Sequence, residues 1–405
     1  MKLLLIHQIF LSAGQGGGTR HFELSRYAVN RGQEVTVIAS DVSYLDGKRV
    51  GGDGTPELVE GVEVRRARTL QTLHRSFVWR VLAFLSFTVT SVFKGLGVKG
   101  VDVVMGTSPP LPQAFSAWVV AFLRRKPFLL EIRDLWPDFA VDMGVMTNPV
   151  LIWLARRLEV FLYNRATHIL VNSPAYYDYL IDTRGVRHDK ISVIPNGVDP
   201  TMFDPQETGA VVREEFGLRD KFVVTYAGAI GPANDISTII RAADQLKDQT
   251  DIHFLLVGDG KDRLNVEALK DQLGLTNVTF AGLRSKNEMR VILGASDVCL
   301  ATLMSIAMFK TVYPNKIFDY LAAGRPIILG IDGVIRDVVE KAEAGVFVEP
   351  GSEQAIVEAV QQMHANPHEA RAMGLRGCEY VAEHFNRMDQ AEAFVRLVTG
   401  LAKAR

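Results

Sequence analysis

The 405-residue chain has only two cysteines, Cys299 and Cys378, and their spacing matches neither a metal-binding nor a redox motif. So few cysteines exclude a small disulfide-built domain and indicate a reducing compartment. An excess of one charge is also missing, because 45 lysines and arginines stand against 46 aspartates and glutamates. No global field draws such a chain to nucleic acid, so we expect no nucleic-acid partner.

The sequence also has no apolar run of transmembrane length. Its longest weakly polar segment, residues 81–93, is shorter than the roughly 20 apolar residues that a spanning helix needs. Two apolar stretches with neighbouring arginines could still meet a membrane surface: 77–93 with Arg75 and Arg80, and 150–163 with Arg156 and Arg157. Mostly apolar helices also occur in protein cores, so both alternatives stay open. We expect a cytoplasmic protein, with peripheral contact to the inner membrane face as one alternative.

Short runs rich in Val, Ile and Leu alternate with helix-length amphipathic stretches along the chain. In the first half, strands are predicted at residues 3–6, 35–39, 101–105, 128–132 and 169–172. In the second half, they are predicted at residues 221–227, 252–257, 278–281, 298–300, 326–329 and 345–348. This alternation predicts parallel sheets with helices on both faces. The expected fold class is therefore α/β, with two Rossmann-like, doubly wound halves.

The two halves are separated by Val193–Pro200, where proline and an Asn-Gly pair predict a turn. We expect an N-terminal domain at residues 1–195 and a C-terminal domain at residues 196–387. A last amphipathic helix follows, and we expect residues 388–405 to pack back on the N-terminal domain.

A glycine-rich loop follows the first predicted strand. Glycines between a strand and a helix let the backbone approach a ligand closely, and the helix N-terminus favours an anion. We therefore expect donor contacts from Gly17, Gly18 and Arg20. The glycine spacing is not that of a dinucleotide fingerprint, which argues against a nicotinamide cofactor.

Charged residues lie at and just past the end of a predicted strand, at Glu131, Arg133 and Asp134. Open α/β sheets bind ligands at this edge, so these residues are candidates for catalytic contacts with an acceptor. A simple ion pair between Glu131 and Arg133 is the structural alternative.

Small residues end two strands of the second half, at Gly228, Ala229 and Gly258. Each alone indicates only a turn, but together they suit a nucleotide that lies across the rim of the sheet.

The segment Tyr313–Pro326 contains the strongest local pattern. Pro314 presets a first helical turn that Asn315 can cap, and Lys316 adds a full charge to the free amides of that turn. Such a turn suits a diphosphate. Asp319 lies one turn further and could accept hydrogen bonds from a ribose. Two further cations on a neighbouring strand end could neutralise phosphate, Arg284 and Lys286.

On these motifs the chain resembles family 4 of the retaining glycosyltransferases, which have the GT-B fold. Val193–Pro200 resembles the interdomain signature of that family, and Tyr313–Pro326 resembles its donor-site helix. Arg133–Pro137 and Pro314–Lys316 resemble the bacterial branch that extends lipid-diphosphate-linked sugars in O-antigen and capsule assembly, some members using N-acetyl-fucosamine donors.

The sequence also departs from that family. The paired glutamates of the family correspond to Thr311 and Asp319, so the contact to the donor sugar is altered. Two phosphate-binding cations are replaced near Ala229 and Asn234, so Arg284, Lys286 and Lys316 are expected to take over. An acceptor-site histidine is replaced by Arg133.

The resemblance implies transfer, with retention, of an N-acetylated amino or deoxy-amino hexose from a nucleotide diphosphate. The expected donor is a UDP-sugar, and the expected acceptor is linked to undecaprenyl diphosphate. No Asp-x-Asp motif stands out, so we expect a metal-independent enzyme without a cofactor. Two alternatives remain: a sugar-nucleotide 2-epimerase of the same architecture, and an inactive nucleotide-sugar-binding protein, which the absence of a glutamate at Thr311 suggests.

Overall fold

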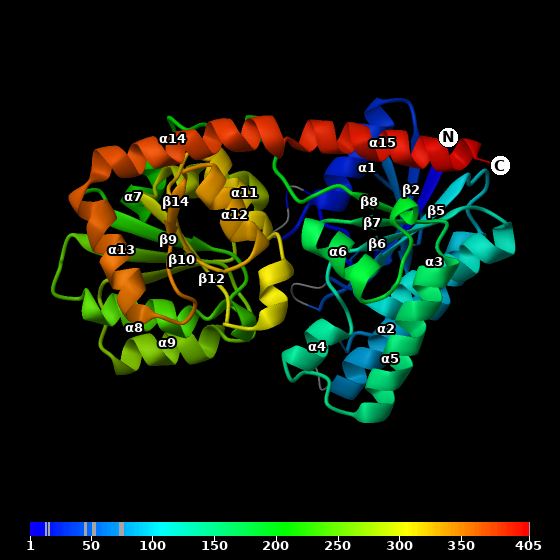
Figure 1. Ribbon diagram of the computed structural model, residues 1–405, viewed down its shortest axis with the longest axis horizontal. Helices are drawn as coiled ribbons and strands as arrows, with labels where there is room; N and C mark the ends of the chain where they lie inside the picture. Colours follow the sequence, from blue (N-terminus) through cyan, green and yellow to red (C-terminus); the bar gives the residue numbers. More distant parts are fainter. Residues whose placement is uncertain (13, 15–16, 44–46, 51–53, 73–76, 405) are drawn as a thin grey trace. The chain divides into compact units, whose positions relative to one another are not determined.

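The computed structural model describes the whole chain except residues 13, 15–16, 44–46, 51–53, 73–76 and 405. It divides into two compact units (Figure 1). The N-terminal unit comprises Met1–Ser12, Thr19–Pro195 and Met388–Arg405, and the C-terminal unit comprises Ala13–Gly18 and Asn196–Arg387. The division after Pro195 coincides with the expected boundary, and the last helix belongs to the N-terminal unit, while Ala13–Gly18 belongs to the C-terminal unit.

The N-terminal unit is built on an eight-stranded sheet in the order β3-β4-β2-β1-β5-β6-β7-β8. Only β3 and β4 pair antiparallel among its described strands, and the other neighbouring pairs are parallel. The strands are β1 (Lys2–Ile6), β2 (Glu34–Ser40), β3 (Glu57–Val59), β4 (Val62–Ala67), β5 (Val103–Ser108), β6 (Phe128–Ile132), β7 (His168–Val171) and β8 (Ile191–Val193).

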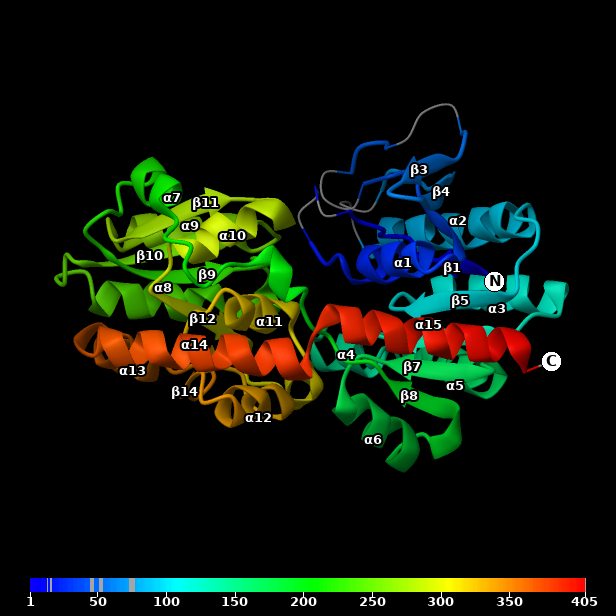
Figure 2. The same ribbon diagram turned by 90° about the horizontal axis from the view of Figure 1, so that it is seen from above.

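Helices lie on both faces of this sheet (Figure 2). They are α1 (Arg20–Asn30), α2 (Phe77–Leu96), α3 (Leu111–Arg124), α4 (Asp138–Asp142), α5 (Pro149–Arg165), α6 (Pro174–Asp182), the 3-10 turn η1 (His188–Lys190) and α15 (Arg387–Lys403). Helix α3 packs on β5 and contacts both α2 and α5. Strands β1, β5 and β6 are almost wholly buried, which explains their continuous apolar sequences.

The C-terminal unit has a six-stranded parallel sheet in the order β11-β10-β9-β12-β13-β14. Its strands are β9 (Phe222–Ala227), β10 (Ile252–Val257), β11 (Val278–Gly282), β12 (Val298–Thr302), β13 (Ile327–Gly330) and β14 (Gly345–Phe347). Its α-helices are α7 (Ala210–Glu215), α8 (Ile236–Gln245), α9 (Arg263–Gln272), α10 (Met289–Gly294), α11 (Asn315–Ala322), α12 (Val334–Lys341), α13 (Glu353–Ala365) and α14 (Pro367–His384). Its 3-10 turns are η2 (Pro200–Met202), η3 (Pro232–Asn234), η4 (Lys286–Glu288) and η5 (Ala307–Thr311).

The doubly wound α/β class expected from the sequence is confirmed, and each predicted strand is present with ends shifted by a few residues at most. Strands β3, β4 and β8 were not predicted from the sequence. Strands β3 and β8 have three residues each, and β4 alternates apolar and charged residues because one of its faces is only half-buried. None of the three forms the continuous apolar run by which the other strands were recognised.

Strand order reverses once in each sheet, between β1 and β5 in the N-terminal unit and between β9 and β12 in the C-terminal unit. In open α/β folds, the loops at the carboxyl ends of such strands diverge, and ligands bind in the crevice between them. Each unit therefore has one natural binding edge.

At the binding edge of the C-terminal unit, two loops approach so closely that only glycine fits. Gly258 follows β10 with φ of +141°, and a Cβ placed there would lie 1.8 Å from the carbonyl oxygen of Gly228. A side chain at position 258 would therefore push the loop after β10 away from the loop after β9.

Replacing Gly258 with alanine should therefore destabilise the C-terminal unit by roughly 2–4 kcal/mol, through backbone strain and steric overlap. Urea unfolding would measure this loss. The matched control is Gly274→Ala, because Gly274 also has positive φ but open space around it. If the two variants lose the same stability, the close approach at Gly258 has no importance of its own.

Candidate active site

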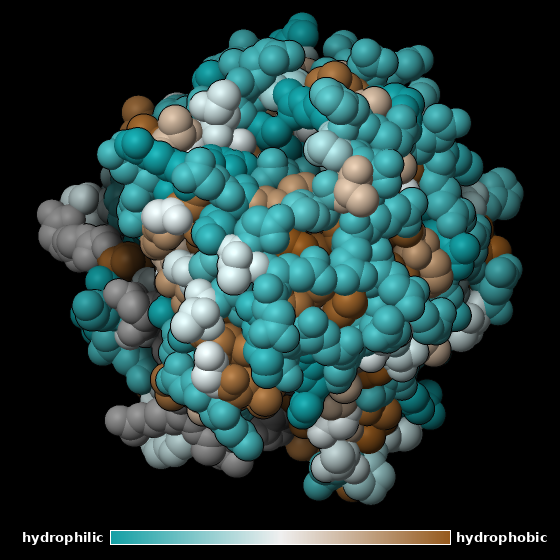
Figure 3. All heavy atoms as spheres, turned by 90° about the vertical axis from the view of Figure 1, so that its left-hand side faces the viewer, coloured by the Kyte–Doolittle hydropathy of each residue, from teal (hydrophilic) through white to brown (hydrophobic). Residues whose placement is uncertain are grey.

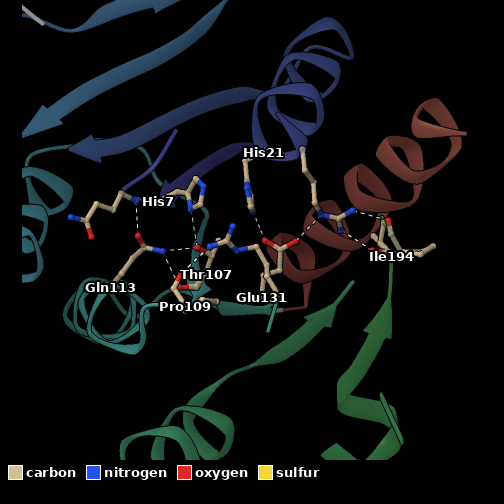
Figure 4. Close-up of polar contacts among 11 residues, drawn as sticks. His7, His21, Thr107, Pro109, Gln113, Glu131 and Ile194 are labelled. Atoms are coloured by element: carbon tan, nitrogen blue, oxygen red, sulfur yellow. Dashed lines mark hydrogen bonds and ion pairs between the residues drawn. The ribbon is translucent and has the colours of Figure 1, made fainter. Parts of the chain in front are cut away.

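The binding edge of the N-terminal unit contains a buried polar network (Figure 4). Glu131, in β6, has no exposed surface, and both of its carboxylate oxygens are bonded. Its Oε1 accepts from Nε of Arg20 at 3.1 Å, and its Oε2 is bonded to Nε2 of His21. A buried carboxylate thus joins the first turn of α1 to β6.

Burial raises the pKa of Glu131, but His21, Arg20 and Arg133 together outweigh it and hold that pKa well below its usual range. Burial also lowers the pKa of His21, more than Glu131 raises it. The stable arrangement is an ionised Glu131 with Arg20 as its cation and a neutral imidazole donating from Nε2.

A second chain of hydrogen bonds begins at His7, which follows β1. Its Nδ1 lies 2.9 Å from Oγ1 of Thr107, and its ring centroid lies 4.0 Å from that of His21. The Gln113 amide donates to the carbonyl oxygen of Thr107, while its Oε1 accepts from the backbone N–H of Gln8. Burial, followed by His21 and Arg133, holds the pKa of His7 well below its usual range.

Two polar groups at this edge have no partner among the described residues: the side-chain amide of Gln8 and Nε of Arg133. Gln8 is only 4% exposed. A buried amide without a hydrogen bond costs about 1–3 kcal/mol, so a ligand that bonds to it gains that energy. The neighbouring Arg133 does donate through one terminal nitrogen to the Pro109 carbonyl, at 2.8 Å.

The structure changes the roles expected for two of the predicted residues. Arg20, expected to contact the donor, is 4% exposed and donates to Glu131 and to the carbonyls of Ile194 and Pro195. Glu131, expected to orient an acceptor hydroxyl, has both oxygens occupied inside the unit. Both are therefore positioning residues. The alternative ion pair between Glu131 and Arg133 is not the contact observed, since Arg20 and His21 bond to this carboxylate.

Asp134 remains a candidate for a direct catalytic contact with an acceptor. It is partly exposed just past β6, and burial raises its pKa to about 6, with Arg133 offsetting part of the increase. A carboxylate with such a pKa can accept a proton near neutral pH.

The binding edge of the C-terminal unit is centred on Lys316, in the first turn of α11. Its Nζ donates to Oη of Tyr226 at 2.7 Å and to Oδ1 of Asn234 at 3.1 Å. Tyr226 donates in turn to the carbonyl oxygen of Ala229. Burial lowers the pKa of Lys316 to about 7. The Lys316 ammonium group therefore contacts the loop after β9. A Cβ atom placed on Gly228 in that loop would lie 3.1 Å from Nζ of Lys316.

Helix α11 begins as expected, with one difference. Pro314 is the N-cap residue, and Asn315, expected to cap the helix, is its first residue and makes no capping bond. Asn315 is exposed and lies beside Gly18 of the glycine-rich loop. A Cβ atom placed on Gly18 would lie 3.8 Å from Nδ2 of Asn315. Gly17, with φ of +124°, is also exposed. The structure thus brings Gly18 next to the first turn of α11.

Of the three cations expected to share the diphosphate, Lys316 alone has no carboxylate partner among the described residues. The Nζ of Lys286 is bonded to Oδ1 of Asp319. Arg284 pairs with Glu215 at 2.6 Å and with Glu288 at 3.4 Å. This differs from our expectation, because Arg284 and Lys286 have their charges compensated within the protein, and a ribose at Asp319 must share that carboxylate with Lys286.

Thr311, at the end of η5, donates to the carbonyl oxygen of Met308 at 2.7 Å. The glutamate expected at this position from the family resemblance is thus replaced by a hydroxyl that is bonded within the same turn. Among the residues that the structure describes, no group of three or more His, Cys, Asp or Glu side chains is arranged to hold a metal ion.

The two binding edges also contain residues that were not predicted as site residues from the sequence: His7, His21, Thr107, Gln113 and Tyr226. His7 and His21 were visible at the ends of a strand and a helix that both lead to the binding edge. Thr107, Gln113 and Tyr226 had no such signal, because each lies within a regular strand or helix.

Comparison with known proteins identifies both units. Residues 15–197 match the family model of the glycosyl transferase 4-like domain, and residues 211–379 match that of the glycosyl transferases group 1. The chain is a GT-B glycosyltransferase.

A relative of this glycosyltransferase is the putative colanic acid biosynthesis glycosyl transferase WcaI of Escherichia coli. The two are 25% identical over 383 residues, which cover 89% of this chain and 92% of WcaI. Similarity therefore extends through both units.

Solved structures share the fold. Sucrose-phosphate synthase from Thermosynechococcus elongatus has a TM-score of 0.78 at 21% identity, with all of both chains covered. HepE from Anabaena, solved in complex with UDP-glucose, has a TM-score of 0.74 at 18% identity, covering 99% of the glycosyltransferase and all of HepE. The expected GT-B fold is thereby confirmed.

The buried histidines make a prediction about acid stability. A histidine whose pKa is lower in the folded than in the unfolded state binds protons on unfolding, so stability falls as pH falls below about 6.5. Each such histidine costs up to about 1.4 kcal/mol per pH unit. His7→Gln should therefore weaken the pH dependence of the unfolding free energy of the N-terminal unit between pH 7 and 5.

Urea titrations at several pH values would measure this slope. His368→Gln is the control, because His368 is exposed on α14. Equal slopes for the wild-type protein and His7→Gln would show that His7 is not held in its neutral form by burial.

Proposed function

We propose that this glycosyltransferase transfers a sugar from a nucleoside diphosphate donor to a lipid-linked saccharide in the assembly of a surface polysaccharide. The environment of Lys316 is the observation that supports the donor part of this proposal. This lysine is the candidate cation without a carboxylate partner in the described part of the chain, and it lies between the first turn of α11 and the loop after β9.

A departing nucleoside diphosphate needs positive charge and free backbone amides where its own charge develops. Lys316 and the first turn of α11 would supply both. We assign Gly17, Gly18, Gly228, Ala229 and Gly258 to the backbone surface along the donor. Pro314 and Asn315 belong to the helix start, Thr311 to the sugar side and Asp319 to the ribose.

UDP is our proposed nucleotide, supported by the UDP-glucose held by HepE. The proposed sugar is an N-acetylated amino or deoxy-amino hexose, and retention of configuration follows from the family resemblance. We propose that no metal or other cofactor takes part, and that the chain works in the cytoplasm.

The acceptor half rests on the binding edge of the N-terminal unit. Gln8 and Arg133 offer hydrogen-bonding groups without partners among the described residues, and Asp134 offers a carboxylate with a raised pKa. We assign the acceptor hydroxyl to Asp134 and Arg133, with Glu131 holding the surrounding network. The name of WcaI, which refers to colanic acid biosynthesis, supports a polysaccharide acceptor.

Lys316→Ala should lower the rate of sugar transfer by roughly 100-fold or more, because one preorganised charge at a leaving group contributes that much. A thermal-shift screen of nucleotide sugars would first identify the donor, which stabilises the folded state on binding. Radiolabel transfer with that donor in excess EDTA would then measure the rate. Lys310→Ala is the control, because Lys310 is an exposed lysine paired with Asp332.

Circular dichroism would verify that Lys316→Ala is folded. Full activity in that variant would exclude Lys316 from the diphosphate site. Activity that disappears in EDTA and returns with Mg²⁺ would contradict the metal-free proposal.

Donor affinity should also fall as pH rises from 6 to 8. Burial lowers the pKa of Lys316 to about 7, so the free protein has a charged Lys316 below pH 7 and a neutral one above it. The diphosphate binds the charged form, and affinity approaches a tenfold loss per pH unit above 7. Calorimetric titration with UDP-glucose would measure the effect, which Lys316→Ala should abolish; a pH-independent wild-type affinity would contradict it.

The membrane alternative concerns the N-terminal unit. No helix among the described residues is long and apolar enough to cross a membrane. Helices α2, α3 and α5 nevertheless expose a series of large apolar side chains, which we call the apolar face: Trp79, Leu82, Leu85, Val89, Phe93, Phe122, Leu123, Val150, Leu151, Trp153, Leu154 and Val160. Arg157 lies over the ring of Trp153 at 5.4 Å, and Arg165 over that of Phe161 at 5.6 Å.

The C-terminal unit differs. Its exposed large apolar residues are scattered, and its end that faces the viewer in Figure 3 is mainly hydrophilic. Aromatic and basic side chains together suit the interface of an anionic bilayer. We propose that the apolar face rests on the membrane that contains an undecaprenyl-diphosphate-linked acceptor. Arg75 lies outside the described residues, and the side chain of Arg80 is also not described.

Vesicle flotation tests this contact. Phe93→Ser combined with Trp153→Ser should weaken partitioning to phosphatidylglycerol vesicles roughly tenfold, because two exposed aromatic side chains are lost. Leu264→Ser is the control, since Leu264 is 79% exposed in the C-terminal unit. If the wild-type protein stays unbound with these vesicles, the apolar face does not contact membranes.

A further inference from the structure

A second polar site lies in the C-terminal unit, at the opposite edge of the sheet from Lys316. A pocket of about 530 Å³ lies between α7, the segment that precedes β12, and the start of β13. These are the amino ends of the strands. A five-residue strand such as β12 is about 16 Å long, so this pocket is separate from the binding edge at Lys316, which we call the donor edge.

Four arginines line the pocket, and two of them are neutralised by their neighbours. Arg213 pairs with Asp297 at 2.7 Å, and Arg219 pairs with Glu214 at 2.8 Å. The third carboxylate of the lining, Glu207, is paired with an arginine outside the lining, Arg290, at 3.6 Å. Every carboxylate of the lining therefore has a partner already.

The other two arginines, Arg325 and Arg371, have no carboxylate partner among the residues that the structure describes. Arg325 donates to the carbonyl oxygen of Glu207, and Arg371 donates to the carbonyl oxygens of Pro205 and Gly324. Backbone carbonyls hold these guanidinium groups in place but do not neutralise them. Two positive charges remain at the pocket without a counterion from the described chain.

The burial of Arg325 without a carboxylate partner costs free energy when no ligand is bound. Arg325 is 8% exposed, and its Nε has no hydrogen-bond partner among the described residues. Burial lowers its pKa, and Arg371 and Arg213 lower it further, while Asp297 offsets only part of this effect. A buried charge of this kind is normally paired. An anion in the pocket would satisfy it.

We propose that this pocket is a binding site for a small phosphate-bearing molecule, held by Arg325 and Arg371. Two guanidinium charges match a dianionic phosphate, and their planar groups can each offer two parallel N–H donors to its oxygens. The volume of the pocket lies within the range of small-molecule sites and leaves room for an organic group beside the phosphate. The site belongs to neither the donor nor the acceptor in the proposed function.

Thermal unfolding of the full-length protein tests the site, with inorganic phosphate and glucose 6-phosphate as probes and chloride keeping the ionic strength constant. We expect a saturable rise in melting temperature in the wild-type protein. Arg371→Gln, at a partly exposed position, should weaken apparent binding at least tenfold. The matched control is Arg376→Gln on the same helix, where Arg376 pairs with Glu343 and Glu369.

Arg325→Lys gives a second variant that keeps the buried charge but loses the planar donors, and it should also bind more weakly. Lys316→Ala separates this site from the donor edge and should keep the full shift. Tighter binding of glucose 6-phosphate than of phosphate would identify an ester as the occupant, and equal binding would identify the free ion. Retention of the full shift in both arginine variants, or its loss only in Lys316→Ala, would overturn the proposal.

Discussion

The charge of Glu131 constrains the arrangement of the N-terminal unit at its binding edge. A carboxylate with no exposed surface is stable only when its oxygens are bonded and its charge is balanced. Arg20 and His21 meet that requirement from the first turn of α1, and Arg20 also reaches the carbonyls of Ile194 and Pro195. Three segments of the chain, β6, the first turn of α1 and Ile194–Pro195, are therefore linked through this carboxylate and Arg20, which fixes the polar groups around them.

The C-terminal unit balances the charge at its binding edge in a different way. Its binding edge leaves the Lys316 ammonium group without a counterion from the described residues and keeps it among neutral hydrogen-bond partners, Tyr226 and Asn234. Close glycine contacts at Gly228 and Gly258 leave the backbone free of side chains there. One edge is thus built around internal neutralisation, whereas the other is built around a charge that a ligand can neutralise.

Most of the fold could be predicted from the sequence, because buried parallel strands and their helices have distinct patterns of apolar residues. The helix start at Pro314 could also be predicted from local sequence, whereas the assignment of Lys316 to a diphosphate stays a prediction. The partners of Glu131 could not be predicted in this way, because they lie more than 100 positions away in the sequence. The pairing of Arg284 with Glu215 escaped for the same reason: a local pattern shows which residues are charged but not which distant residues neutralise them.

The contact between Lys316 and Asn234 has an evolutionary consequence. A lysine at position 234 would bring a second ammonium group to a place where Lys316 already lies 3.1 Å from the Asn234 side chain. Substitutions at these two positions therefore cannot be neutral independently: a cation gained at one requires the other to move or to lose its charge. Within this family the two positions should co-vary, with one positive charge exchanged between them rather than accumulated.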